Sequence, residues 1–128
     1  MIYLLSVGLI LKQLRRSKNI SQSKIAEMLD LSLSSIYRFE NGGQISYDNY
    51  LKYCKCLEVS PYIPLIIYSN DKMLLLYNRI CQSILDKDIR DMILSIFIQE
   101  LDQGIDEQFE KIFLKLDKKI NDDFIKII

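Results

Sequence analysis

Side chains capable of acid–base, nucleophilic or metal chemistry are few and dispersed in this chain. Its 128 residues include three Cys and 17 Asp or Glu, but no His. The lack of imidazole excludes Ser-His-Asp and Cys-His arrangements and any zinc site that needs a His ligand. Cys54 and Cys56 lie two apart in a predicted helix and cannot grip one metal ion, and Cys81 lies in an apolar stripe. The acidic residues scatter over predicted helix surfaces, and no Gly-rich phosphate loop occurs. We therefore expect no enzymatic activity, no metal site and no cofactor.

The charge of the chain is balanced overall but divided unevenly along its length. Lys and Arg total 17, equal to the acidic residues, so the net charge is zero. Residues 1–60 hold eight bases and five acids, a net charge of +3, and residues 61–128 hold nine bases and twelve acids, a net charge of −3. This asymmetry indicates two parts with different tasks.

The odd number of cysteines rules out a complete set of internal disulfides and favours a reducing compartment. The apolar opening Met1–Leu11 has no basic leader and is shorter than the roughly 20 residues that span a bilayer. We therefore expect a cytoplasmic protein that does not associate with a membrane.

Apolar residues recur at helical spacing throughout, and only four Gly and two Pro interrupt them. The expected fold class is all-α. Ser60-Pro61 and Ser69-Asn70-Asp71 mark breaks, and we place a domain boundary between residues 1–68 and 69–128.

In the N-terminal part, Val7, Leu11 and Leu14 form one face of a first helix. Ser21, Ser32 and Ser46 are expected to cap the second, third and fourth helices, because a serine hydroxyl accepts an unpaired N–H of the first turn. The second and third helices are joined by a very short turn at Asp30-Leu31. The third presents small polar residues and an arginine outward, as a helix-turn-helix unit does.

The same residues carry a resemblance to a known family. Residues 7–68 resemble the Xre-like helix-turn-helix domains of the phage repressor and Cro class, with matches at Leu14-Arg15, Ser21-Gln22, Ile25-Ala26, Ser32, Ser34, Ile36, Arg38, Glu40-Asn41-Gly42, Leu57 and Val59-Ser60. The resemblance implies a five-helix, lambda-repressor-like domain that binds double-stranded DNA with its third helix in the major groove.

The resemblance also implies roles for individual residues. The expected base-reading positions are Ser32, Leu33, Ser34 and Arg38, and the expected phosphate contacts are Ser21, Gln22, Tyr37 and Asn41. A guanidinium can bind O6 and N7 of guanine together, which makes Arg38 the foremost specificity residue. Ser21 and Ser32 are caps first, and Tyr37 either contacts the DNA backbone or is merely exposed. Arg15 and Glu40 match a pair that forms an internal salt bridge in relatives.

Three positions depart from the family pattern. Asp30 occupies the turn position where Gly is usual, Glu58 replaces the usual Gly or Asn after the fourth helix, and Ile45 stands where Pro is common. A net charge of +3 is modest for a DNA-binding domain, so we expect that two domains must act together.

The C-terminal part predicts three helices, over about 71–85, 88–103 and 106–127. Asp88 is expected to cap the second and Gly104 to end it. Residues 92–98 are apolar nearly all round, and Leu9 and Ile10 add apolar surface where relatives carry charge. We expect a homodimer interface that includes Met92, Ile93, Ile96, Phe97, Phe109, Phe113, Leu116 and Ile120. The alternative is that these side chains only complete the core of one protomer.

These features together predict a transcriptional regulator, most simply a repressor, that binds a palindromic operator as a dimer. A variant of this prediction gives the C-terminal part a peptide or protein effector. A different function is also open, in which the protein is an antitoxin or anti-regulator, the C-terminal helices bind a partner protein and DNA binding is secondary.

Overall fold

Every regular element in the described part of the chain is an α-helix. The computed structural model describes residues 7–127, with the side chains of residues 7–122. The helices are α1 (Val7–Ser17), α2 (Gln22–Leu29), α3 (Leu33–Glu40), α4 (Tyr47–Cys56), α5 (Tyr62–Ser69), α6 (Asp71–Ser83) and α7 (Lys87–Ile127). The all-α fold class predicted from the sequence is confirmed.

The expected serine caps begin three of the first five helices. Ser21 Oγ accepts the N–H of Lys24 at 3.0 Å, and Ser32 Oγ accepts that of Ser35 at 3.1 Å. Ser46 Oγ accepts the N–H of Asn49 at 3.2 Å. Each serine has extended backbone, so the chain enters the helix from a defined direction.

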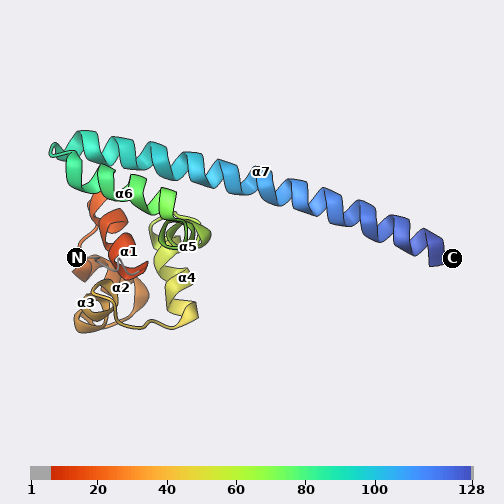
Figure 1. Ribbon diagram of the computed structural model, residues 1–128. Helices are drawn as coiled ribbons and strands as arrows, with labels where there is room; N and C mark the ends of the chain where they lie inside the picture. Colours follow the sequence, from red (N-terminus) through yellow and green to blue (C-terminus); the bar gives the residue numbers. More distant parts are fainter. Residues whose placement is uncertain (1–6, 128) are drawn as a thin grey trace.

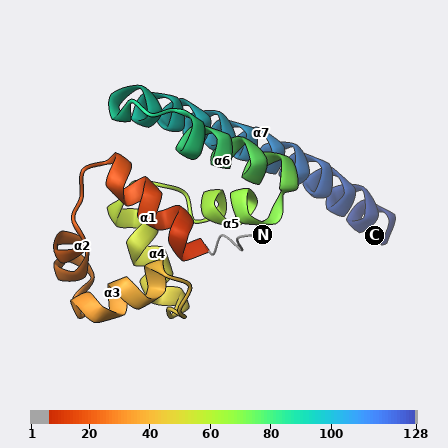
Figure 2. The same cartoon turned by 60° about the vertical axis from the view of Figure 1, so that its left-hand side comes forward.

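The first five helices form a compact body, with α6 and α7 along one side of it (Figure 1). The helix-turn-helix pair α2 and α3 lies at the other side of this body in both views (Figures 1 and 2). Helix α7 has 41 residues, which corresponds to about 60 Å of length. Its second half projects beyond the body (Figure 1).

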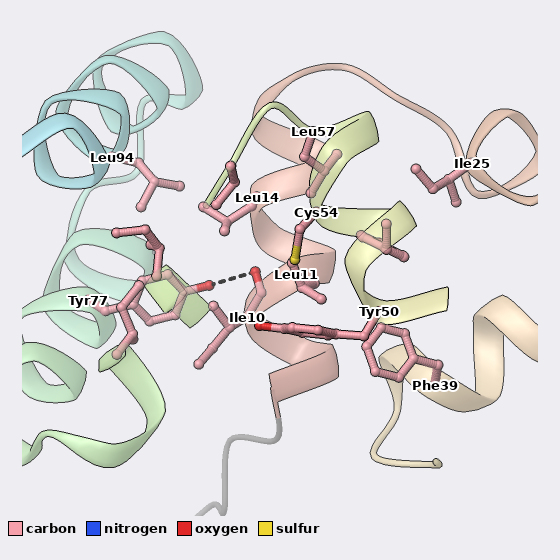
Figure 3. Packing of buried hydrophobic residues seen from close by; sticks show 14 of the residues in the cluster. Ile10, Leu11, Leu14, Ile25, Phe39, Tyr50, Cys54, Leu57, Tyr77 and Leu94 are labelled. Carbon is pink, nitrogen blue, oxygen red and sulfur yellow. Dashed lines mark hydrogen bonds between the residues drawn. The ribbon is translucent and has the colours of Figure 1, made fainter. Parts of the chain in front are cut away.

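One continuous core joins the body to α6 and α7 (Figure 3). Tyr77 of α6 is buried over α1, and its hydroxyl donates to the backbone oxygen of Ile10 at 3.4 Å. Ile10 is 0% exposed, and Leu94 of α7 lies against the same cluster. The expectation that Ile10 adds to an interface surplus is therefore wrong: α6 covers it within the protomer. Leu9 is half-buried.

The C-terminal part has two helices where the sequence predicted three. Gly104 does not end a helix but lies inside α7, where a Cβ would meet nothing within 4 Å. Glycine permits a left-handed stop without requiring one, and the apolar face continues across it. The predicted cap at Asp88 is also wrong: Asp86 Oδ1 accepts the N–H of Ile89 at 3.0 Å.

The predicted interface residues separate into two groups. Phe97 is 8% exposed and belongs to the protomer core, and Ile93 is half-buried beside it. The others are exposed, namely Met92, Ile96, Phe109, Phe113, Leu116 and Ile120. Phe97 and Ile93 thus complete the core of one protomer, and an interface at the exposed six stays a prediction. Among the helices of residues 7–127, none has the length and apolar character needed to cross a membrane.

Candidate DNA-binding site

The two helices of the helix-turn-helix unit are held at a fixed angle by a left-handed turn. Asp30 has a φ of 55°, and the next N–H, that of Leu31, returns to the carbonyl oxygen of Ala26 at 2.9 Å. The turn therefore demands the conformation that Gly adopts most easily, at the position where the sequence has Asp. Glu58, the second departure from the family pattern, also has a positive φ of 56°.

A buried ion pair anchors the end of this unit, at Glu40, to α1. Arg15 Nε donates to Glu40 Oε2 at 2.8 Å and Arg15 Nη2 donates to Oε1 at 2.9 Å, a bidentate geometry. Tyr53 Oη donates to Glu40 Oε2 at 2.6 Å, and Gln22 Nε2 donates to Oε1 at 3.1 Å. Glu40 thereby joins α1, α2, α3 and α4 at one carboxylate.

The protonation of Glu40 reflects these contacts. Burial acts to raise the pKa of Glu40, but the hydrogen bonds from Arg15, Tyr53 and Gln22 outweigh it and hold that pKa below its ordinary value. Burial, supported by the neighbouring Glu40 carboxylate, raises the pKa of Tyr53. The pair is therefore charged at neutral pH, and Tyr53 remains a donor.

The reading face of α3, which we define as Ser32, Leu33, Ser34, Tyr37 and Arg38, is exposed throughout. Leu33 is 51% and Tyr37 59% exposed. Within the described residues, the Arg38 guanidinium makes no hydrogen bond or ion pair. The opposite side of α3 is buried through Ile36, Phe39 and Glu40.

Three of the four expected phosphate contacts, Ser21, Gln22 and Asn41, make hydrogen bonds within the domain. The side-chain amide of Gln22 donates to Glu40, and Asn41 Nδ2 donates to the backbone oxygen of Tyr37 at 2.8 Å. Each amide keeps a second N–H and its oxygen, so the internal bond fixes the orientation of the group while leaving it able to bind. The hydroxyl of Ser32 is likewise occupied by its cap.

The structure brings further polar residues beside the reading face that the sequence reasoning missed. A hollow of about 530 Å³ is lined by Lys12, Arg16, Ser21, Gln22, Ser23, Leu33 and Tyr37, together with Arg15. Lys12 and Arg16 thus bring two cations to the N-terminus of α2. Their spacing of four on the side of α1 away from Leu11 and Leu14 was the available signal.

A second hollow of about 380 Å³ places Gln44 beside Arg38. The loop that carries Gln44 lies close against α3, because the N–H of Gly43 donates to the backbone oxygen of Arg38 at 2.7 Å. A Cβ at Gly43 would lie 2.7 Å from that same oxygen, so glycine is needed for the approach. No periodicity pointed to Gln44, because it lies in a loop.

The domain thus combines a short helix pair, whose second helix is exposed, with flanking cations and a buried Arg-Glu ion pair. Residues 11–63 match the helix-turn-helix family. This segment is a helix-turn-helix DNA-binding domain of the Xre and lambda-repressor-like family. The family match covers α2 and α3 of the helix-turn-helix domain and reaches from α1 into α5. No curated protein and no solved structure matches the chain.

Proposed function

We propose that the protein is a sequence-specific transcriptional regulator, acting as a repressor, that binds a palindromic operator as a homodimer. In this proposal residues 1–68 read the DNA and residues 69–128 assemble the dimer. The observation that carries it is the reading face of α3: five exposed residues, including an arginine with no partner among the described residues, beside the cations Lys12 and Arg16.

The proposed complex places α3 in the major groove, with Arg38 and Ser34 toward base edges and Leu33 toward a thymine methyl group. Ser32 contributes to the same face through the N-terminal end of α3. Ser21, Gln22, Tyr37 and Asn41 contact the sugar–phosphate backbone, with Lys12 and Arg16 as additional phosphate partners. A two-fold dimer sets two such helices about one DNA turn, roughly 34 Å, apart.

The first test is selection of binding sites from a random DNA pool, followed by affinity measurements on the selected site. Arg38→Ala should weaken binding by a factor that corresponds to about 1–3 kcal/mol and relax a guanine preference at one position of each half-site. Arg79→Ala is the matched control, because Arg79 is an exposed arginine on α6, away from α3. Equal affinity of the Arg38→Ala and wild-type proteins would contradict the assignment of the reading face.

Phosphate contacts predict a different signature. Lys12→Ala should weaken binding to all sequences alike and reduce the salt dependence of the affinity by about one released counterion per site. A change in base preference caused by Lys12→Ala would contradict its assignment to the backbone.

A second candidate function rests on the exposed apolar side chains of the distal half of α7. In that alternative a different protein covers them, and the chain is an antitoxin or anti-regulator, or a regulator with a peptide or protein effector. Sedimentation of the purified chain alone separates the two, because only the homodimer needs no other component.

A further inference from the structure

Helix α7 carries an apolar face that runs from Leu94 to Ile120. Leu94, Ile98, Leu101 and Ile105 follow one another at helical steps and are buried or half-buried against the core. Phe109, Ile112, Phe113, Leu116 and Ile120, which we call the distal row, continue the same face and are all exposed. The face of α7 that packs on the protomer's own core up to Ile105 thus continues beyond that core as exposed apolar surface.

The start of the distal row shows which way it points. The ring of Phe109 meets the ring of Tyr62 on α5 edge to face, with centroids 5.3 Å apart and an interplanar angle of 86°. Tyr62 is itself exposed, as are Leu65 and Tyr68 on the same helix. We call these three residues the α5 face. The distal row therefore begins on the body side of α7, next to a second patch of exposed apolar side chains.

The direction of the row restricts how a second copy can cover it. Helix α3 lies on the side of the body away from α7 (Figures 1 and 2). If two α7 helices met face to face along their distal rows, parallel or antiparallel, the two-fold axis would place the second body on the opposite side of the helix pair. The two α3 helices would then lie on opposite sides of the dimer, unable to bind adjacent grooves of one DNA duplex.

We propose that the distal row of α7 packs on the α5 face of a second copy of the chain, and that the second copy returns the same contact. This inference rests on the proposed dimeric function and names the surface that completes it. The two α7 helices then run antiparallel and side by side over both bodies, and both α3 helices lie on the same side of the dimer.

The available surface agrees with a reciprocal contact. A large side chain offers roughly 150–250 Å² when free, so the five half-exposed residues of the distal row present on the order of 500 Å². A standard interface needs about 800 Å² from each partner. The α5 face supplies the remainder, because each protomer contributes both surfaces.

The first experiment compares two leucines on opposite sides of α7. Leu116 in the distal row is 53% exposed, and Leu114, on the opposite side, is 58% exposed. Leu116→Glu should raise the dimer dissociation constant in analytical ultracentrifugation by about thirtyfold or more, and Leu114→Glu should leave it unchanged. Far-UV circular dichroism checks that both variants remain folded. Equal effects of the two changes would overturn the proposal.

The second experiment identifies what the row packs on. Leu65→Glu on the α5 face should weaken the dimer as Leu116→Glu does. Mixing the two variant chains should restore dimers in part, because the mixed pair keeps one contact between an unchanged distal row and an unchanged α5 face.

The outcomes separate this proposal from the proposed function. Normal dimerisation of Leu65→Glu, with loss in Leu116→Glu, would overturn the packing and leave the dimeric function standing. Failure of the mixed chains to associate more strongly than either variant alone would also overturn the packing. A monomeric wild-type chain would overturn the packing and the dimer together.

Discussion

The buried pair of Arg15 and Glu40 offers a sharp test of how the helix-turn-helix domain is held together. Both side chains lie inside the domain, at 6% and 0% exposure, and the carboxylate also accepts hydrogen bonds from Tyr53 and Gln22. Glu40→Leu leaves a buried guanidinium without a counter-charge, and Arg15→Met leaves a buried carboxylate. Each single change should lower the free energy of unfolding by about 3–5 kcal/mol.

The double variant Arg15→Met/Glu40→Leu should lose less than either single change. It removes both charges together, and apolar replacement of a whole buried pair is often close to neutral. The remaining cost comes from the Tyr53 hydroxyl, which loses its acceptor in the interior, at about 1–3 kcal/mol. Gln22 is partly exposed and water can replace its bond. The interaction energy in the double-mutant cycle should therefore reach at least about 3 kcal/mol.

Chemical denaturation followed by far-UV circular dichroism gives all four free energies. The surface pair of Lys87 and Asp91, 2.9 Å apart on α7, is the control. Asp91→Asn should cost at most about 0.5 kcal/mol, because a pair at the surface of one helix, with Lys87 half-exposed, gains little in water. Additive losses in the Arg15 and Glu40 cycle would refute the reasoning, since the two residues would then not act as one unit.

Three further predictions follow from single positions. The pKa of Glu40 is lowered in the folded state, so the stability that its charge contributes is complete above the ordinary pKa of 4.5 and is lost as the pH falls below that value. The free energy of unfolding of Glu40→Gln should therefore fall less steeply with acid than that of the wild type. Equal slopes would count against the pair. Gly8→Ala should lower the free energy of unfolding by at least about 2 kcal/mol, because a Cβ would lie 2.0 Å from the backbone oxygen of Phe39. Gly104→Ala should raise it by up to about 1 kcal/mol, because the space around Gly104 is open. Thermal denaturation compares the two variants, and an equal response would refute the close approach of α1 and α3. Glu58→Gly should raise the free energy of unfolding by about 1 kcal/mol, because glycine adopts the positive φ of this position without strain. Lys55→Gly, inside α4, should lower it by a similar amount in the same assay. A loss of stability in Glu58→Gly would contradict the assigned backbone strain.

Local signals in the sequence predicted the first five helices well. Ser21, Ser32 and Ser46 each begin a helix, as expected, because a cap acts within three residues of its own position. The outward side of α3 was expected from its small polar residues and arginine, and Ile36 and Phe39 are buried on the other side of the helix. The same reasoning was wrong at Asp88 and Gly104, where two neighbouring residues could cap and where glycine fits a helix interior as well as a stop.

What the sequence could not show depends on contacts between distant segments. The bond from Gln22 to Glu40 joins residues 18 apart, and Tyr77 reaches Ile10 across 67 residues. Gln44 is positioned by a loop that folds back on Arg38. Packing between distant segments decides the orientation of such groups, and the periodicity of one sequence does not predict it.

Helix α6 covers α1, and this packing limits how freely the DNA-binding domain can be exchanged between proteins. Tyr77 shields Ile10, so a chain cut after Tyr68 would open the core along α1 to water. The family match ends at residue 63, but the folding unit extends into α7 through Leu94 and Phe97. Recombination that joined residues 1–68 to a foreign C-terminal part would have to supply another segment that covers α1. Any interaction that stabilises α6 and α7 in their present position also stabilises the DNA-binding helices that pack against them.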